Sequence, residues 1–237
     1  MVKVVDNVAH GPAYHNLRFE RKFVYPNAIV DDVINNEVLT NSFGFREIFH
    51  KRTVNNIYFD DWSHTFYKMN ISGDGKREKL RLRWYGDAFY EVKAPTLEIK
   101  KKYGEVGDKY SHKIKNLEFD LRLLPIDKLS HFVNGNIDDK SLLSKMELLF
   151  PTLFNSYERR YFLSDCEKFR ITIDYNMVFY NPNSNPYYLT ESKLEDIILE
   201  LKYNTADDME SREITQSLTE RLSKNSKYVR GYDILYH

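Results

Sequence analysis

The 237-residue sequence predicts an α+β fold built from short β-strands and a few helices. The strands are predicted because apolar and charged residues alternate with a period of two, which places them on opposite faces of a strand. The clearest case is segment 79–85 (KLRLRWY), in which Lys79, Arg81 and Arg83 alternate with apolar residues. The helices are predicted because other segments repeat apolar residues at the spacing of a helical turn. The alternation recurs in four further segments, at 17–23, 97–103, 168–175 and 197–203.

The charged faces of these strands are dominated by Arg and Lys. Strands of one domain lie side by side, so these faces would line one surface or one lumen. The natural partner of such a cationic surface is a polyanion. The opposite faces should be packed, and the residues expected there include Leu80, Leu82, Ile99, Ile171 and Leu199.

Composition limits the class of protein. Hydrophobic residues make up 42% of the chain, and 35 basic residues balance 35 acidic ones, so any cationic site must be local. The one cysteine, Cys166, excludes an internal disulfide framework. No apolar run is long enough for a membrane span, and the N-terminus lacks the apolar core of a signal peptide. We expect one cytoplasmic domain over 1–237, with a loosely ordered segment at 1–16.

The elements of the first half follow from pattern and punctuation. Pro26 and the apolar spacing after it predict a helix. The sequence GDG at 73–75 is a turn signal, and YGD at 85–87 ends a strand before a second hairpin arm. Segment 63–71 favours neither helix nor strand. The expected order is a strand at 17–25, a helix at 26–40, and strands at 54–60, 79–85 and 97–103.

In the second half a helical pattern runs over 121–154, with the breaker NGN at 134–136 dividing it into two helices. Strands resume at Tyr157 and continue at 168–175 and 197–203, around a loop at 181–186. The last helix is expected at about 207–223, because its first turn is acidic and the helix dipole favours acidic residues there.

The charged face of the first strand carries Arg18, Glu20 and Lys22. Taken alone, this strand reads as a solvated edge strand with an alternating surface. Because the same charged face is repeated on other strands, an anion-binding site is favoured over a solvated edge. A carboxylate such as Glu20 beside cations can also hold Mg²⁺ or Mn²⁺, which take oxygen ligands and share them with substrate phosphates.

Arg81 and Arg83 project side by side, roughly 7 Å apart given a rise of about 3.3 Å per residue. That spacing suits successive phosphates of a chain, each held by a planar guanidinium. Any one such cation is more often a surface salt-bridge partner, but the set together is not. The set continues on other strands with Lys100, Lys102, Arg159 and Arg170, and the carboxylate of Glu200 lies with these cations.

Three polar residues near the C-terminus, Lys224, Ser226 and Lys227, form a basic cluster after the last predicted helix. A solvated helix end and a ligand site explain them equally well. The sequence lacks zinc-binding, nucleophile-elbow and phosphate-loop motifs. The abundant Tyr and Phe alternate with charges and so belong to the core, and we expect no nucleic-acid partner.

The order RFERK, LRLRWYGD, LEIKKKYGEVGDK, SYERRYF, FRITID, ILELKY and SKNSKYVRG resembles the polyphosphate polymerase (VTC) domain. That family belongs to the CYTH-like triphosphate tunnel metalloenzymes. The resemblance runs from about Arg18 to Gly231. It implies an antiparallel β-barrel, a triphosphate tunnel with a charged lumen and flanking helices, which takes ATP or another nucleoside triphosphate, polyphosphate and a divalent metal.

The resemblance also implies roles for single residues. Glu200 would be the metal ligand, Glu20 being a further carboxylate candidate, and Lys109 or Lys113 would fill one remaining lysine position. The first strand departs from the family's ExExK signature, since Arg18 stands where the first Glu would be. The implied phosphate ligands are Lys22, Arg81, Arg83, Lys100, Tyr157, Arg159, Arg170, Lys224, Ser226 and Lys227.

The activity expected from this resemblance is metal-dependent transfer of the γ-phosphate of ATP to a growing polyphosphate, with Mn²⁺ or Mg²⁺. Phosphoryl transfer needs alignment and charge neutralisation more than covalent chemistry. Hydrolysis of triphosphate and non-catalytic binding of polyphosphate remain alternatives. The presence of Glu20 and Glu200 favours a metal and hence chemistry, because binding alone would need only the cations.

Overall fold

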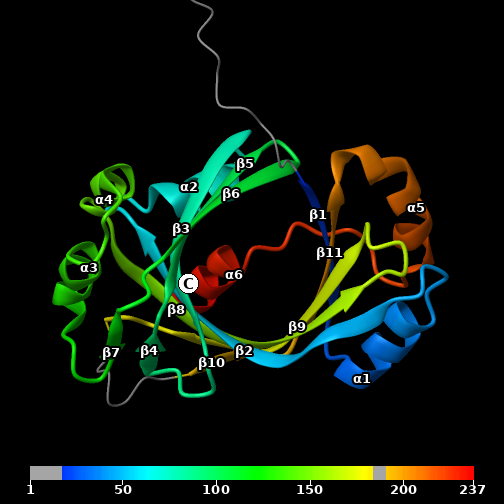
Figure 1. Cartoon of the computed structure of the whole chain (residues 1–237), viewed down its shortest axis with the longest axis horizontal. Helices are drawn as coiled ribbons and strands as arrows, with labels where there is room; N and C mark the ends of the chain where they lie inside the picture. Colours follow the sequence, from blue (N-terminus) through cyan, green and yellow to red (C-terminus); the bar gives the residue numbers. More distant parts are fainter. Residues whose placement is uncertain (1–17, 184–190) are drawn as a thin grey trace, which may run out of the picture.

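A computed structural model describes residues 18–183 and 191–237, and eight antiparallel strands within them close into a barrel (Figure 1). The order around the barrel is β9-β11-β1-β6-β5-β3-β2-β8, and pairing of β8 with β9 closes it. This confirms the α+β class and the antiparallel barrel. The expected loose segment 1–16 lies outside the described residues. The strands are β1 (Arg18–Tyr25), β2 (Arg46–Asp60), β3 (Lys76–Tyr85), β5 (Thr96–Tyr103), β6 (Val106–Lys113), β8 (Phe150–Leu163), β9 (Arg170–Tyr180) and β11 (Ile197–Asn204).

Short strands and helices surround the barrel. The strand β10 (Ser192–Leu194) pairs with β9, and β4 (Glu91–Lys93) pairs with β7 (Glu118–Asp120) in a small separate sheet. Within the part of the chain that the structure describes, no helix combines the length and apolarity needed to cross a membrane. The helices are α1 (Val30–Val33), continued by a π-helical turn η1 (Ile34–Leu39), α2 (Thr65–Ser72), α3 (Ile126–Asn134), α4 (Lys140–Met146), the 3₁₀ turn η2 (Thr205–Asp207), α5 (Asp208–Ser217) and α6 (Lys227–Tyr236).

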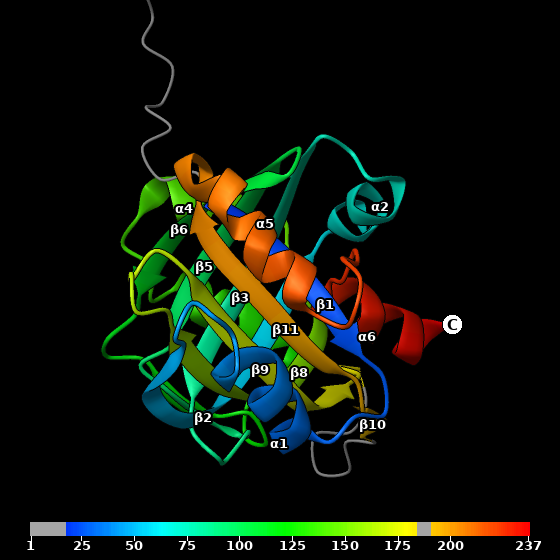
Figure 2. The same ribbon diagram turned by 90° about the vertical axis from the view of Figure 1, so that its right-hand side faces the viewer.

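The apolar faces of the barrel strands point outward, and the flanking helices cover them. On one side Leu80 and Leu82 pack in a cluster with Leu129 and Val133 of α3. On the other side Leu199 packs in a cluster that contains residues of α1 and α5, and Figure 2 shows α5 lying across β1 and β11. The expectation that Leu80, Leu82, Ile99, Ile171 and Leu199 are packed is confirmed, since each is at most 5% exposed.

Helix α6 closes one end of the barrel. Figure 1 shows it in the middle of the ring of strands, and Figure 2 shows it at one end beside α2. Its residues Tyr228 and Tyr232 pack in a buried cluster with inward-facing Tyr58 and Tyr157 of the strands. The Tyr228 hydroxyl donates a hydrogen bond to the buried Asp60 carboxylate at 2.6 Å. Tyrosine side chains therefore fill the lumen at this end.

The structure corrects several predicted boundaries. The helical pattern expected up to residue 154 ends with α4, and β8 begins at Phe150 instead of Tyr157. Pro151 explains the difference, because the residue before a proline is pushed from helical to extended geometry. The ambiguous segment 63–71 contains α2, and α5 ends at Ser217 because Leu218 is extended.

The sequence also missed α6, which follows the supposed last helix. Ser226 caps it by accepting a hydrogen bond from the Val229 N–H at 3.2 Å. Gly231 in its middle argues against a helix on propensity alone. The packing explains this glycine, since a Cβ there would lie closer than 3.0 Å to the side chains of Phe179 and Leu153.

We predict that Gly231→Ala destabilises the protein by about 1–3 kcal/mol, because the buried Phe179 and Leu153 cannot give way to the added methyl group. Urea denaturation checks this. The control is Gly135→Ala, where a Cβ would meet backbone oxygens at 3.6 and 3.7 Å and the backbone is helical. Equal stability of the Gly231→Ala and Gly135→Ala variants would contradict the close packing of α6 against Phe179 and Leu153.

Candidate functional site

The barrel encloses a cavity of about 620 Å³ whose lining residues come from all eight barrel strands and from α6. Twelve of the described residues that line it are Arg or Lys, and four are Asp or Glu. The cations are Arg18, Lys22, Lys79, Arg81, Arg83, Lys100, Lys109, Arg159, Lys168, Arg170, Lys202 and Lys227, and the acids are Glu20, Asp108, Glu167 and Glu200. The cavity is therefore a cationic lumen.

Most of the predicted site residues meet in this lumen. The strand alternation brings them there, because each strand turns its even or odd positions inward. Of the two lysines considered for the remaining position, Lys109 lines the cavity and Lys113 does not. Lys102 and Lys224 do not line it either. The residues that it brings together are Glu20, Lys22, Arg81, Arg83, Lys100, Tyr157, Arg159, Arg170, Glu200, Ser226 and Lys227.

Lys102 lies near the tip of the β5–β6 hairpin. It pairs with Arg77 on one side and Gly107 on the other. Burial, Arg77 and Lys100 lower the pKa of Lys102. Lys224 is exposed in the loop before α6. Arg170 is also exposed, but it contributes to the lining at the mouth of the cavity.

Two buried carboxylates neutralise part of the cationic wall. Glu98 lies 2.7 Å from Arg81, 3.6 Å from Arg83 and 3.0 Å from Lys109. Burial raises the pKa of Glu98, but Arg81 and Arg83 outweigh it and hold that pKa below its usual range. These contacts fix the direction of the two arginines of β3.

The second of these carboxylates is Asp174 of β9, which is fully buried. It accepts a hydrogen bond of 2.6 Å from Arg159 and forms an ion pair with Lys227 of α6. Burial alone would raise its pKa, yet Arg159 and Lys227 lower it below its usual range. Asp174 therefore joins β8, β9 and α6 through charge.

A different pair of carboxylates, Glu20 and Glu200, faces the lumen from the adjacent strands β1 and β11. Glu20 forms an ion pair with Lys100, and Glu200 lies 3.3 Å from Lys202 and 3.8 Å from Arg159. Burial raises the pKa of Glu200, but Lys202 leads a group of cations that lowers it well below the usual value. Both carboxylates are thus held ionised.

The donor set of Glu20 and Glu200 fits a hard divalent cation that is shared with a substrate. Among residues 18–183 and 191–237 no group of three or more Asp, Glu, His or Cys side chains could hold a metal alone. Mg²⁺ is commonly bound through one or two carboxylates together with substrate phosphates and water. Glu20 and Glu200 supply that number of carboxylates beside the cationic wall.

Lys79 faces the lumen without an ion pair among the described residues, and the nearby Lys22 lies 3.9 Å from the Glu200 carboxylate. The Lys79 Nζ donates to Ser226 Oγ at 2.6 Å, and the Lys22 Nζ donates to the Asn225 carbonyl at 2.8 Å. Burial lowers the pKa of Lys22 to about 8, and burial together with Lys22 and Lys100 lowers that of Lys79 well below its usual value. This region therefore favours an incoming anion.

Sequence reasoning did not select Lys79, Lys202, Glu98 or Asp174 as site residues, although each lines the cavity or pairs with a residue that does. The signal was present, because Lys79 shares the face of Arg81, and Asp174 shares that of Arg170. What the pattern lacks is the pairing of Asp174 with α6, which comes from a distant segment.

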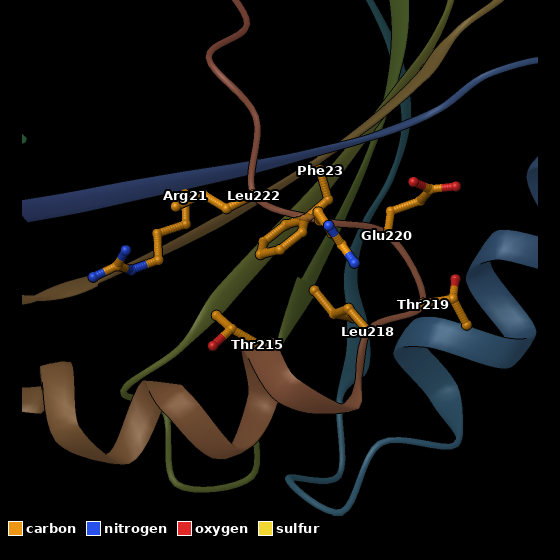
Figure 3. A pocket seen from close by; sticks show the side chains of 8 residues that line it. Arg21, Phe23, Thr215, Leu218, Thr219, Glu220 and Leu222 are labelled. Carbon is orange, nitrogen blue, oxygen red and sulfur yellow. The ribbon is translucent and has the colours of Figure 1, made fainter.

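A second hollow of about 400 Å³ lies outside the barrel, between β1, the end of α5 and the segment after it (Figure 3). Arg21 and Phe23 of β1 line it, and Figure 3 shows the Phe23 ring beside Leu218. These two residues alternate with Glu20 and Lys22, which face the lumen. The strand β1 thus separates the two spaces, and the outer hollow is not part of the site.

We predict that Asp174→Asn destabilises the protein by about 3–5 kcal/mol at pH 7, because it leaves Arg159 and Lys227 without their buried counter-charge. The pKa of Asp174 is lowered in the folded state, so its contribution is complete above the unfolded value of about 3.9 and is lost as pH falls below it. Urea denaturation at several pH values should show the difference from the parent shrinking in acid.

The matched control is Asp165→Asn, whose carboxylate pairs with Arg46 at 3.1 Å but is 73% exposed. Exposed ion pairs contribute about 0–1 kcal/mol, so this variant should resemble the parent. Equal losses for both variants would contradict the role of burial.

Comparisons with known proteins bear on the fold and the family. None of the curated proteins matches the chain significantly. Among solved structures, the PH1819 protein from Pyrococcus horikoshii has a TM-score of 0.50 at 14% identity, covering 90% of this chain and 97% of that one. At this identity the similarity supports the fold alone.

Two further structures are similar at lower scores. A putative adenylate cyclase from Vibrio parahaemolyticus has a TM-score of 0.48 at 13% identity, covering 89% of this chain and 95% of that one. A putative adenylyl cyclase from Hippeastrum with a dominant triphosphatase activity has a TM-score of 0.47 at 11% identity, covering 91% of this chain and 95% of that one. Because these two TM-scores are below 0.5, the fold assignment depends on the observed barrel and not on these two structures.

The family model of the VTC domain matches residues 17–236. This match covers nearly the whole chain and includes all of the strands that form the cationic lumen. The protein therefore belongs to the VTC domain family.

Proposed function

We propose that the protein transfers the γ-phosphate of ATP, or of another nucleoside triphosphate, to the end of a growing polyphosphate chain with the help of Mn²⁺ or Mg²⁺. The observation that carries this proposal is the excess of cations in one lumen, where twelve Arg or Lys side chains among the described residues face four acidic ones. Cations gathered at such density are stable only beside water or a polyanion. Membership of the VTC domain family supports the same substrate class.

The cationic wall supplies positions for successive phosphates. Arg81 and Arg83 point into the lumen from adjacent inward positions of β3, and Lys100 lies on the neighbouring strand β5, paired with Lys79. Arg159 faces them from β8. Planar guanidinium groups held in place by Glu98 and Asp174 can bind phosphate oxygens without first reorganising, which is the main requirement for phosphoryl transfer.

Further phosphate positions are proposed around Lys79, which has no ion pair among the described residues. Lys22, Lys79 and Ser226 lie together there, and Lys227 carries the cationic wall on to α6. Because Ser226 also caps α6, a phosphate bound here would contact the N-terminal end of that helix, where the dipole favours anions. Lys224 and Lys102, outside the lining, are proposed to meet only the ends of a long chain.

Glu20 and Glu200 are the residues that would hold the metal. When bound, a divalent ion neutralises charge on phosphate oxygens and so stabilises the transition state. Lys100 and Lys202 keep the two carboxylates ionised and oriented. No side-chain nucleophile is required, since the terminal oxygen of the acceptor phosphate attacks the γ-phosphorus and the nucleoside diphosphate leaves.

Hydrolysis of the triphosphate and binding of polyphosphate without catalysis would both use the same cationic wall. The products of the reaction therefore distinguish these activities from chain synthesis. Purified protein is incubated with ATP and Mn²⁺, and the products are separated by length. Long phosphate chains support the proposal, free phosphate alone indicates a hydrolase, and unchanged ATP that nevertheless stabilises the protein indicates a binding module. The cytoplasm is the proposed location, because ATP is available there.

We predict that Glu200→Gln lowers metal-dependent turnover at least a hundredfold, because the amide lacks the charge that a divalent ion requires. Binding of tripolyphosphate in the absence of metal should persist or strengthen, since a negative charge has left the cationic lumen. Turnover is measured under saturating Mn²⁺, and binding is measured by calorimetry. The control is Glu118→Gln, whose side chain is 68% exposed on β7. Unchanged turnover of Glu200→Gln would place the metal elsewhere.

We also predict that tripolyphosphate binding is accompanied by proton uptake at pH 8.5. Burial lowers the pKa of Lys22 to about 8, so much of it is neutral at that pH, and a nearby anion favours its charged form. Affinity should therefore fall as pH rises through about 8. Calorimetry in buffers of different ionisation enthalpy measures the uptake.

The variant Lys22→Arg provides the control for this prediction, because its guanidinium stays charged at pH 8.5. Its proton uptake should be smaller than that of the parent. Identical uptake by the two proteins would show that Lys22 does not titrate on binding.

A further inference from the structure

A cluster of aromatic side chains and one arginine stands at the mouth of the cationic lumen. Phe49 of β2 and Tyr161 of β8 line the cavity, with their ring centroids 5.7 Å apart in an edge-to-face arrangement. The guanidinium carbon of Arg52 lies 4.8 Å from the centre of the Phe49 ring and 5.7 Å from that of Tyr161. We call these three residues the rim cluster.

The rim cluster differs from the other aromatic residues that face into the barrel. Tyr58, Tyr157 and Tyr228 are buried in the cluster that seats α6 at the closed end. Phe49, in contrast, is 49% exposed. An apolar ring held open to solvent beside a charged cavity has a surface available for stacking.

Arg52 strengthens this interpretation. No ion pair with a carboxylate is found for it among the described residues, and its recorded contacts are with the rings of Phe49, Tyr85 and Tyr161. An arginine without a counter-charge can stack on a planar ring and attract an anion at the same time.

The strand register connects the rim cluster with the charged lumen. Phe49 pairs with Tyr161, Tyr161 with Thr172, and Thr172 with Glu200. Thr172 lines the cavity and is 5% exposed, and its hydroxyl has no hydrogen-bond partner among the described residues. A buried unpartnered hydroxyl between the rings and the charges indicates a polar ligand group at that position.

We propose that the rim cluster binds the base of a nucleoside triphosphate, while the sugar and phosphates pass Thr172 toward Glu200. Tyr161 and Glu200 are two strand steps apart, about 10 Å at the usual strand spacing. The base then stacks on Phe49 and Tyr161 at the mouth, and the phosphates reach the cations inside. This inference rests on the proposed function in so far as the lumen takes a nucleoside triphosphate.

Stacking on aromatic faces is tolerant of sequence, because every base offers a π-face. The rim cluster therefore favours a nucleoside triphosphate over an inorganic triphosphate of the same charge, without strong choice among the bases. The alternative is that the rings only cover the apolar residues beneath them, in which case they act on both ligands equally.

The test compares ATP with tripolyphosphate, measured by calorimetry in the presence of a chelator so that no turnover occurs. Phe49→Ala should weaken ATP binding about tenfold, as expected for the loss of one base–aromatic stack, and leave tripolyphosphate binding within twofold of the parent. Phe49→Tyr should keep the affinity for ATP, since it retains the ring.

Trp62→Ala is the matched control, because Trp62 is an aromatic residue that is 85% exposed and does not line the cavity. It should change the affinity for neither ligand. Thermal melts verify that each variant is folded. Because Phe49 is exposed, its replacement should not disturb the fold.

Four outcomes would overturn the inference. Equal losses of ATP and tripolyphosphate affinity in Phe49→Ala would show that the ring acts through the fold. Unchanged ATP affinity in that variant would show that the base lies elsewhere. If the parent bound tripolyphosphate but not ATP, the rim cluster would have no base to hold, and if it bound neither ligand the proposed function would fail as well.

Discussion

The whole arrangement depends on how the barrel neutralises the cations that it turns inward. Glu98 and Asp174 each hold a buried arginine and an additional lysine, and both carboxylates stay ionised because these cations lower their pKa. Without such partners, buried charges would cost several kcal/mol each. The neutralisation is incomplete, however, since Lys79 faces the lumen without an ion pair to a carboxylate among the described residues. The buried carboxylates thus compensate enough of the positive charge for the barrel to fold. The positive charge that is left can attract a polyanion.

A charged lumen makes this an inverted barrel, and the inversion explains the helices. The apolar face of each strand points outward, so α3, α5 and their neighbours must cover it. Helix α6 has a different task, since it fills one end of the lumen with tyrosines and brings Ser226 and Lys227 to the cavity. Its position is fixed by packing at Gly231 and by charge at Asp174. Stability and ligand binding therefore share this helix.

The lumen has two chemically different ends, which gives a bound chain a direction. Tyrosines close the end at α6, whereas the other end opens past Phe49, Tyr161 and the exposed Arg170. The carboxylates of Glu20 and Glu200 lie between these ends on adjacent strands. A nucleotide whose base stays at the open mouth would place its phosphates between these carboxylates and the arginines of β3. Such an arrangement suits an in-line transfer that relies on charge and alignment.

The sequence by itself determined the inward set of residues, because alternation along a strand depends only on the local backbone. It placed Lys22, Arg81, Arg83, Lys100, Arg159 and Glu200 on charged faces, and the described residues confirm that they line one cavity. Only the tertiary structure decided how far along the barrel each position lies. The cavity lining includes Lys109 and leaves out Lys113 and Lys102, and the folded chain brings Asp174 of β9 to Lys227 of α6. Register between distant strands and the docking of α6 are set by packing and charge between remote segments, which a local pattern does not contain.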